Sequence, residues 1–314
     1  MAIEKLPKII ALAGPTASGK TDLGIQLAKR FNGEIISADS RQIYKKMTIA
    51  TGKPLGVWQE VDGTSAYVVE GVPHYLMDLI DPGEEFTLAQ FKESALSAIR
   101  HIFQRGKVPL IVGGTGLYLW SLIDNLSLPP VAPNKKLRDG LEGKSLVELV
   151  ELLRNIDPKS ALKVDLKNQQ RVIRALEVAI LTGNSFTEQQ LKGDPLFEVL
   201  QLGIRRPQGE LNERINERIK RQFEDGIIEE TKDLIRQHYQ WNLSSMKGIG
   251  YKEIDHYLRG ELSLKEVREK IQGATRRYAK RQLTWFKRDD RIMWLPPENF
   301  DAAARLISDF LAEE

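Results

Sequence analysis

An eight-residue segment near the amino terminus carries the residues best suited to chemistry. Its sequence, GPTASGKT, satisfies the phosphate-loop pattern G-x-x-x-x-G-K-[ST] and comprises Gly14, Pro15, Thr16, Ala17, Ser18, Gly19, Lys20 and Thr21. The apolar run 9–13 before it predicts a buried strand, and residues 21–31 after it predict a helix. Such a loop directs backbone N–H groups at an anion, while Lys20 adds positive charge and Thr21 a hydroxyl for Mg²⁺ or a phosphate oxygen. The segment therefore predicts a phosphate or pyrophosphate site rather than a chance glycine turn.

A carboxylate and a glycine-rich turn follow two further predicted strands. Asp39 comes after the apolar run 34–38, and the turn 113–116, with sequence GGTG, comes after the run 108–112. In an open parallel sheet, ligands bind beyond the carboxyl ends of the strands, so Asp39 and Thr115 are expected to face the same crevice as the phosphate loop. The alternative for Asp39 is a structural one, in which it caps the following helix.

The turn 113–116 also bears on the class of chemistry. A nucleoside triphosphatase of the Walker type usually ends this strand in an acidic residue that holds Mg²⁺. Two glycines and Thr115 stand here instead, and glycine lets a ligand approach the backbone closely. This difference favours a reaction other than ATP hydrolysis.

Basic residues gather at two places in the second half of the chain. Arg214 and Arg218 lie four residues apart, so a helix would place both on one face, either solvated or aimed at a leaving pyrophosphate. Residues 268–291 hold nine Lys and Arg against three acidic residues, an excess larger than the net charge of +3 of the whole chain. This segment predicts a contact with a polyanion, with Trp285 and Phe286 expected mainly in the core.

Composition narrows the remaining possibilities. Apolar residues at 41% and charged residues at 28% are typical of a soluble globular protein. The absence of cysteine excludes disulfides, thiolate metal sites and a cysteine nucleophile, and the four histidines lack zinc-ligand spacing. No run is long enough to span a bilayer, and the first residues lack the apolar region of a signal peptide. We expect a cytoplasmic monomer without a membrane partner.

The order of patterns predicts an α/β fold. Strands are predicted at 9–13, 34–38, 108–112 and 197–204, with helices at 21–31 and 87–105 between the first three. Near-continuous apolar strands alternating with helices indicate a parallel sheet covered on both faces. Further helices are predicted at 208–224, 226–239, 263–288 and 301–312.

The middle of the chain differs in kind. Helical patterns at 135–154 and 168–182 are separated by a break at residues 157–158, and no strand pattern appears. We therefore predict a catalytic core made of residues 1–124 and 196–314, interrupted by an all-helical insertion at 125–195.

Taken together, the motifs identify a family resemblance. The chain resembles the bacterial tRNA dimethylallyltransferases, also called tRNA isopentenyltransferases, over nearly its whole length. Nine motifs of that family occur in order: GPTASGKT (14–21), IISADSRQIY (35–44), TGKP (51–54), VPHYLMD (72–78), IVGGTGLY (111–118), NQQRVIRALEV (168–178), LNERINER (211–218), GIGYKE (248–253) and AKRQLTWFKR (279–288).

The resemblance implies a reaction. Dimethylallyl pyrophosphate would give its five-carbon group to N6 of the adenine just 3′ of the anticodon, position 37, in tRNA. The fold would be a P-loop nucleotide-kinase core that binds an isoprenoid pyrophosphate where a kinase binds ATP, with Mg²⁺ as cofactor, held in part by Thr21. Asp39 matches the family's general base, Thr115 lines the reaction channel, and Arg218 binds the pyrophosphate.

The resemblance also implies where tRNA is bound. The helical insertion would hold the anticodon stem-loop, together with segments of the core. The positions that match RNA contacts of the family are Asp39, Ser40, Arg41, Gln42, Gln170, Arg171, Val172, Ile173, Arg174, Lys247, Gly248, Ile249, Gly250, Tyr251, Lys252, Lys280, Arg281, Gln282, Thr284, Trp285 and Lys287.

Two departures from the family pattern affect local contacts. Gln208 stands where many relatives carry arginine, and the sequence MTIA at 47–50 replaces the more common MDIG. Three other functions share parts of the pattern: an ATP-binding small-molecule kinase, an isopentenyltransferase acting on free adenine nucleotide, and an RNA-binding protein without activity. The long insertion and the basic segment favour an RNA substrate over a free nucleotide.

Overall fold

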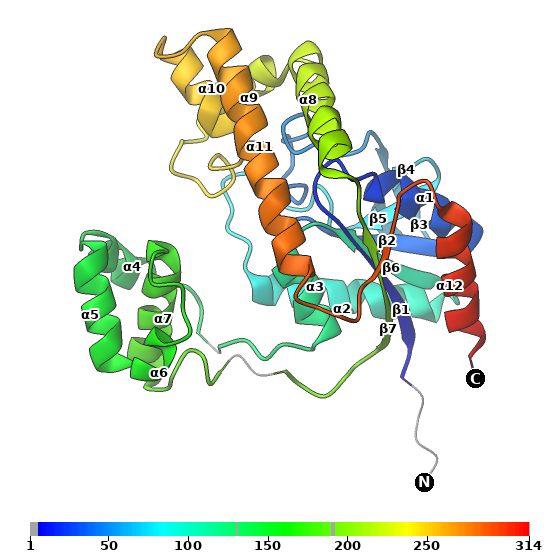
Figure 1. Ribbon diagram of the computed structural model, residues 1–314, viewed down its shortest axis with the longest axis horizontal. Coiled ribbons are helices and arrows are strands. Elements are labelled where there is room, and N and C mark those ends of the chain that lie inside the picture. The colour runs from blue at the N-terminus through cyan, green and yellow to red at the C-terminus, as the bar shows by residue number, and fades with distance from the viewer. Residues whose placement is uncertain (1–5, 130, 190–191, 314) are drawn as a thin grey trace. The chain divides into compact units, whose positions relative to one another are not determined.

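The computed structural model describes residues 6–129, 131–189 and 192–313, which form two compact units (Figure 1). One unit contains the described residues up to 122 and those from 196 onward, and the other spans residues 123–195. Within the described residues, no helix has the length and apolar character that crossing a membrane requires.

The first unit is built on an eight-stranded sheet with the order β3-β4-β5-β2-β6-β1-β7-β8. The strands are β1 (Lys8–Ala13), β2 (Gly33–Ala38), β3 (Val57–Val61), β4 (Thr64–Val69), β5 (Val72–Tyr75), β6 (Val108–Gly113), β7 (Glu198–Ile204) and β8 (Met293–Leu295). Neighbours from β5 to β8 are parallel, which confirms the parallel sheet expected from the four apolar runs. Strands β3, β4 and β5 pair antiparallel at one edge and were not predicted.

Two tight turns explain this antiparallel edge. Asp62 and Gly63 connect β3 to β4 with φ values of 49° and 75°, and Glu70 and Gly71 connect β4 to β5 with φ values of 49° and 82°. Two consecutive residues with positive φ form the hairpin turn whose twist matches that of the strands, and Asp-Gly is one of its preferred sequences. The Asp62-Gly63 pair is thus a local sequence signal for the β3–β4 hairpin.

Helices cover both faces of the sheet. Apolar residues of α1 (Lys20–Arg30) and α12 (Phe300–Ala312) share one core cluster with Ile10, Leu12 and Leu110. Because side chains alternate along a strand, the fully buried Ile9 and Ile111 point to the opposite face, against which α2 (Leu88–Gln104) packs. The parallel strands are therefore buried on both sides, and their carboxyl ends are left as the place for a ligand.

A second core lies among the helices that follow β7. It is formed by α8 (Gln208–Glu224), α9 (Ile227–Arg236), α10 (Tyr251–Leu258) and α11 (Leu264–Phe286). In Figure 1, α8 and α11 run side by side above the sheet. Helix α10 was not predicted, and α11 begins at a capping box formed by Ser263 and Glu266.

The second unit is helical, with α4 (Lys135–Glu142), α5 (Leu146–Ile156), α6 (Pro158–Ala161) and α7 (Gln169–Thr182). The single helix predicted at 135–154 is wrong, because Ser145 and Glu148 form a capping box that starts α5 as a new helix. The carboxylate of Glu177 is fully buried and is held by Arg138, Arg174 and the backbone N–H of Asn134. An isolated bridge joins Leu126 to Lys192 at the base of this unit.

Candidate functional site

The phosphate loop lies between β1 and α1, as its sequence predicts. Gly19 caps α1 with a φ of 98°, in the left-handed region that favours glycine. The helix N-terminus and Lys20 therefore meet at the loop, and the Lys20 ammonium donates to the carbonyl of Pro15 at 3.3 Å. The hydroxyl of Ser18 is buried without a hydrogen-bond partner, so the loop retains an unused polar group.

Lys20, Asp39 and Arg218 share one electrostatic environment. Burial lowers the pKa of Lys20 to about 8, opposed by the Asp39 carboxylate and reinforced by the Arg218 guanidinium. Burial also lowers the pKa of Arg218, and Asp39 again opposes the shift. Three residues that were predicted separately, from the loop, a strand end and a helix face, are thus brought together by the fold.

Asp39 and Thr115 lie side by side at the ends of β2 and β6. The hydroxyl of Thr115 accepts from the backbone N–H of Ser40 at 3.1 Å. The backbone N–H of Thr115 donates to the carbonyl of Ala38, also at 3.1 Å. Asp39 is half-buried, and one carboxylate oxygen accepts from the N–H of Arg41 at 2.9 Å. Residues 40–43, all of them described, form turns rather than a helix, so the alternative role of Asp39 as a helix cap does not apply.

Two tyrosines from different helices complete the surroundings of Asp39. Tyr278, on α11, has its pKa raised to about 12 by burial and by Asp39, and it is hydrogen-bonded to Thr115. Burial, Tyr44 and Asp39 also raise the pKa of Tyr118, on α3 (Gly116–Ile123). Both phenols stay protonated at neutral pH, so Asp39 is the group here suited to accept a proton.

Arginines of the β7–α8 region line the loops of the site. Arg214 donates to the carbonyl of Ala17 at 3.1 Å, and Arg218 donates to that of Thr51 at 3.0 Å. Arg206, just before α8, donates to the carbonyl of Ser18 at 3.0 Å. The face of α8 that carries Arg214 and Arg218 is therefore directed at the loops of the site, and not only at solvent.

Gln282 is placed differently from what its match to an RNA contact suggests. Its side-chain oxygen accepts from the N–H of Thr16 at 2.9 Å, and its NH₂ donates to the carbonyl of Gly114 at 2.8 Å. A Cβ atom on Gly114 would lie 2.3 Å from this NH₂, so only glycine leaves room for the contact. With 6% of its surface exposed, Gln282 joins the phosphate loop to the turn after β6 and has no free side-chain surface for RNA.

Three of the core segments that match RNA contacts lie around the same end of the sheet. The Arg41 guanidinium donates to the carbonyl of Ser244 at 2.7 Å, which joins segment 39–42 to the loop preceding 247–252. Lys247 and Lys252 are exposed there, whereas Tyr251 is 1% exposed and belongs to the interior. The exposed residues of α11 that match RNA contacts are Lys280, Arg281 and Thr284, and Lys287 is exposed directly after the helix.

The aromatic residues of α11 are packed against the protein. Phe286 is 1% exposed, which confirms its predicted place in the core. Trp285 is half-buried, with its ring centroid 4.7 Å from that of Trp120. A Cβ atom on Gly116 would lie 2.1 Å from the indole of Trp285, so this ring is seated closely on the first turn of α3.

In the helical unit, segment 170–174, which matches RNA contacts of the family, contains both buried and exposed side chains. Val172 and Ile173 are 0% and 1% exposed in the core of the unit, so their side chains do not reach the surface. Gln170 and Arg171 are exposed, and Arg174 is paired with Glu177. Any RNA contact by side chains of this segment is left to Gln170, Arg171 and Arg174, because the amphipathic helix turns the other two inward.

Among the described residues, no three or more His, Cys, Asp or Glu side chains gather as a metal site. Thr21, in the first turn of α1, offers a single hydroxyl. Mg²⁺ is often held by one or two protein groups together with phosphate oxygens of a substrate, so this donor set fits a cation that arrives with a pyrophosphate.

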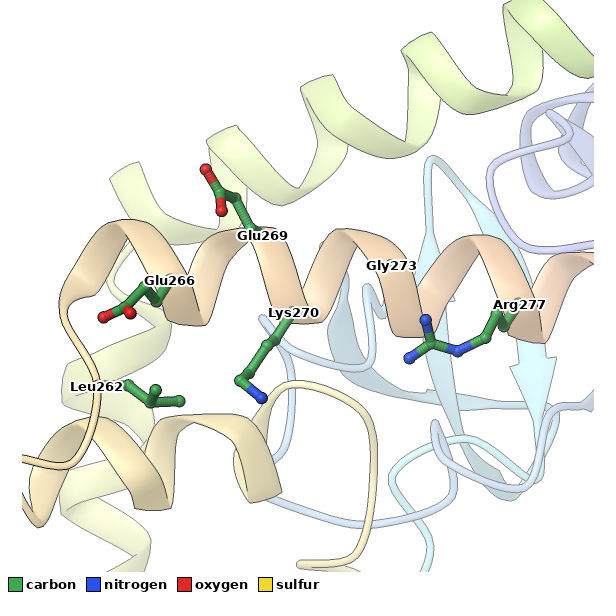
Figure 2. Close-up of a pocket in the computed structure, with 6 residues that line it drawn as sticks. All are labelled: Leu262, Glu266, Glu269, Lys270, Gly273 and Arg277. Carbon is green, nitrogen blue, oxygen red and sulfur yellow. The ribbon is translucent and has the colours of Figure 1, made fainter.

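A separate groove runs along the first half of α11 (Figure 2). Its lining residues are Leu262, Glu266, Glu269, Lys270, Gly273 and Arg277. The groove shares no residue with the phosphate loop or with the surroundings of Asp39, and its charges are mixed. It offers no concentrated charge for a pyrophosphate.

Fold and site together define a P-loop α/β enzyme with an anion cradle and a carboxylate at neighbouring strand ends. The comparisons give the particular family. Residues 42–289 match the family model described as IPP transferase, and residues 7–71 match the one described as isopentenyl transferase. The chain belongs to the IPP transferase family.

Two relatives that match over nearly their whole length are tRNA dimethylallyltransferases. The chain is 42% identical to the tRNA dimethylallyltransferase of Acetivibrio thermocellus over 97% of this chain and 96% of the relative. It is 40% identical to the tRNA dimethylallyltransferase of Geobacter sulfurreducens over 96% of each.

Solved structures agree with this assignment. The tRNA isopentenylpyrophosphate transferase of Bacillus halodurans aligns with a TM-score of 0.69 at 37% identity, covering 97% of this chain and 95% of the other. A eukaryotic dimethylallyltransferase acting on tRNA aligns with a TM-score of 0.79 at 30% identity, covering 98% of this chain and 80% of the other.

Proposed function

We propose that this protein transfers a dimethylallyl group from dimethylallyl pyrophosphate to N6 of the adenine at position 37 of tRNA, 3′ of the anticodon, and releases pyrophosphate. The observation that carries the proposal is the shared environment of Lys20, Asp39 and Arg218. An anion-binding loop and a proton acceptor then lie close enough to interact electrostatically. The full-length similarity to tRNA dimethylallyltransferases supports the choice of substrates.

The reaction breaks the bond between C1 of the dimethylallyl group and the pyrophosphate oxygen while N6 of adenine bonds to C1. Negative charge grows on the departing pyrophosphate. Lys20, Arg218 and the loop N–H groups are suited to stabilise that charge more strongly in the transition state than in the intact substrate. An allylic carbon tolerates positive character, so a loose displacement is chemically reasonable.

Asp39 is proposed as the acceptor of the N6 proton. The exocyclic amine of adenine is a weak nucleophile because its lone pair is delocalised into the ring, and it becomes acidic as it bonds to carbon. A carboxylate within hydrogen-bond reach lowers the barrier by taking that proton. The bond from the N–H of Arg41 occupies one oxygen of Asp39 and orients the carboxylate.

The target adenine has to leave the stack of the anticodon loop before it can reach Asp39. We propose that exposed basic residues near the site, among them Lys247, Lys280 and Arg281, bind the RNA backbone while this happens. Gln170 and Arg171 of the helical unit are proposed as further contacts. A tRNA substrate also supports the expected cytoplasmic location.

We propose Mg²⁺ as the divalent cation, with the Thr21 hydroxyl as one protein ligand. When bound, it neutralises part of the pyrophosphate charge. Lys20, Arg218 and the loop N–H groups hold the rest of the anion, so chelation is expected to weaken pyrophosphate binding rather than abolish it.

The assay that tests the function mixes the protein, Mg²⁺ and radiolabelled dimethylallyl pyrophosphate with either total tRNA or AMP. Label in tRNA alone supports the proposal, and label in AMP supports the free-nucleotide alternative. In a parallel assay with ATP in place of dimethylallyl pyrophosphate, release or transfer of its phosphate would point to a kinase or ATPase, which the missing acid after β6 disfavours. Binding of tRNA with no labelled product would leave only an RNA-binding role.

A further inference from the structure

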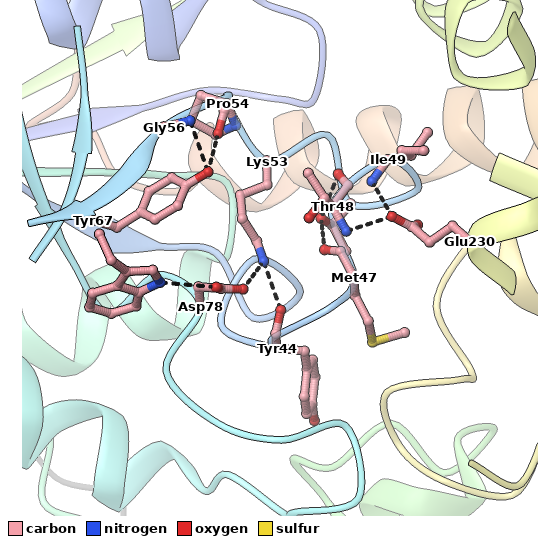
Figure 3. A network of polar contacts seen from close by, with 12 residues as sticks. Tyr44, Met47, Thr48, Ile49, Lys53, Pro54, Gly56, Tyr67, Asp78 and Glu230 are labelled. Atoms are coloured by element: carbon pink, nitrogen blue, oxygen red, sulfur yellow. Dashed lines mark hydrogen bonds and ion pairs between the residues drawn. The ribbon is translucent and has the colours of Figure 1, made fainter. Parts of the chain in front are cut away.

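Glu230, on α9, holds a loop of the site through backbone contacts. Its carboxylate accepts from three consecutive N–H groups, those of Thr48 at 2.8 Å, Ile49 at 2.7 Å and Ala50 at 3.1 Å. Figure 3 shows the carboxylate facing the backbone of this turn. Hydrogen bonds to an ionised acceptor are about twice as strong as neutral ones, so Glu230 is a firm attachment for what we call the anchored loop, residues 47–53.

Other contacts hold the same carboxylate and the same loop. The Tyr251 hydroxyl donates to Glu230 at 2.7 Å, which fixes the acid from α10. The NH₂ of Gln222 donates to the carbonyls of Ile49 at 2.6 Å and Ala50 at 3.2 Å. The turn is therefore held on both its N–H and its C=O groups by helices α8, α9 and α10.

The far end of the anchored loop is attached to the segments that follow β2 and β5. The buried ammonium of Lys53 donates to the carbonyl of Tyr44 at 2.8 Å and pairs with Asp78 (Figure 3). The indole N–H of Trp58 donates to the other oxygen of Asp78 at 3.2 Å. With both ends attached, the middle of the loop has little freedom to move.

That middle is where the loop meets Arg218. The guanidinium donates to the carbonyl of Thr51 at 3.0 Å, and a Cβ atom on Gly52 would lie 1.6 Å from its Nη2. Gly52 also has a φ of 59°, and its carbonyl accepts from the side chain of Gln42 at 3.1 Å. The loop thus forms the wall against which the arginine is placed.

We propose that Glu230 is a positioning residue, which fixes the anchored loop and through it the Arg218 guanidinium that binds pyrophosphate. The inference rests on the proposed function, because it takes Arg218 to bind the departing group. A guanidinium displaced by about 1 Å loses much of its benefit for a developing charge. The backbone attachment also explains why the sequence MTIA is accepted at 47–50: the three N–H groups do not depend on the side chains.

The test compares Glu230→Gln with Glu229→Gln in the full-length protein. Glu229 is the exposed neighbour of Glu230 on α9, and among the described residues its carboxylate pairs only with Lys232. Its replacement by glutamine is therefore the same chemical change at a position that does not contact the anchored loop. We expect Glu230→Gln to weaken pyrophosphate binding, measured by calorimetry without tRNA, by about tenfold, because an amide cannot accept three N–H groups. The matched control is expected to change it by less than about twofold.

Combination with Arg218→Gln separates positioning from general stability. If Glu230 acts through Arg218, adding Glu230→Gln to the Arg218→Gln protein should change pyrophosphate affinity by less than about twofold. Independent, multiplying losses would overturn the inference, as would a lowered melting temperature with unchanged pyrophosphate affinity. Failure of the proposed function looks different: the unmodified protein would then not transfer the prenyl group to tRNA.

Gly52→Ala provides a second variant if Glu230→Gln folds poorly. Its methyl group is directed at Arg218 from the loop itself and leaves Glu230 and its partners in place. We expect a loss of pyrophosphate affinity of about tenfold, absent when Arg218 is already glutamine. Unchanged affinity in Gly52→Ala would show that the loop does not place the arginine, and would overturn the inference.

Discussion

At the scale of single residues, Asp39 has a hydrogen bond that orients its carboxylate, and two cationic side chains share its surroundings. The N–H of Arg41 binds one oxygen, while Lys20 and Arg218 interact with the carboxylate electrostatically. A carboxylate that is held in one orientation beside an anion-binding loop is placed as a general base would be. Its contribution can be measured by a substitution that keeps the hydrogen bond.

Asp39→Asn is that substitution, because the amide oxygen can still accept from the N–H of Arg41. We expect the single-turnover rate of prenyl transfer to fall by about 10²–10⁴-fold, since the amide cannot take up the N6 proton. The affinity for tRNA should be largely kept. Ser40→Ala is the neighbouring control, expected to cost far less, and a fall of less than about tenfold in Asp39→Asn would remove Asp39 from the role of base.

Lys20 gives the site a pH dependence. Burial lowers the pKa of its ammonium to about 8, so the charged form prevails below that pH and is lost above it. Pyrophosphate affinity should therefore fall as the pH rises from 7.5 to 9.5, by up to about tenfold per unit above 8. Lys20→Arg stays charged over this range, so its pyrophosphate affinity should depend less on pH. Ionisation of pyrophosphate itself affects both proteins equally and cancels when they are compared in the same buffers. An equal pH dependence of the two affinities would contradict the assignment of the titration to Lys20.

At the scale of elements, α11 connects two parts of the site. Its buried Gln282 bonds the phosphate loop and the turn after β6, while Lys280 and Arg281 on the same turns of helix are exposed. One helix thus presents a basic surface outward and a positioning side chain inward. The amphipathic pattern of its sequence already predicts two such faces.

Gln282→Glu should disturb the phosphate loop without unfolding the helix. The change replaces the donor to the Gly114 carbonyl by a second acceptor, so one bond is lost and two oxygens repel. We expect pyrophosphate affinity to fall by about tenfold while helix content, measured by circular dichroism, is unchanged. Gln272→Glu makes the same change earlier on α11 and is the matched control; equal behaviour of the two variants would argue against a role for Gln282 in the loop.

The strands and helices were predictable where a single sequence pattern, such as an apolar run, identified them. The strands β1, β2, β6 and β7 are largely apolar runs, and the structure places them within one or two residues of the prediction. Strand β3 is exposed and contains polar residues, and β8 is apolar but has only three residues, too few to stand out as a strand. The start of α5 was missed although Ser145 and Glu148 have capping-box spacing, because the helical pattern continues on both sides.

At the scale of the whole molecule, topology made one part of the candidate site predictable. Asp39, Thr115 and the phosphate loop all follow parallel strands, whose carboxyl ends meet at one edge. Glu230 contacts a segment 180 residues away in the sequence, and Gln282 contacts one 266 residues away. No local sequence pattern predicts contacts at such separations. The positioning role of such residues can be recognised only from the folded structure, which brings the distant segments together.

The charge of the whole molecule is also distributed unevenly, since α11 and the turn after it are far more basic than the average. Arg276 takes part in the fold, because it donates to the side chain of Asn216 on α8 at 2.8 Å. Arg277, Lys280 and Arg281 are exposed and are the better probes of RNA binding. We expect their simultaneous replacement by glutamine to weaken tRNA binding and to reduce its dependence on salt.

The expected size follows from counterion release. Each phosphate contact contributes about 0.7 to 0.9 to the slope of log affinity against log salt, so losing three contacts should reduce that slope by about two to three. A matched triple variant, Lys29→Gln, Arg30→Gln and Arg305→Gln, removes the same charge from exposed positions on α1 and α12. If both triple variants shift the slope equally, the effect belongs to net charge and α11 is not an RNA-binding surface; a change confined to the α11 variant locates the RNA backbone on that helix.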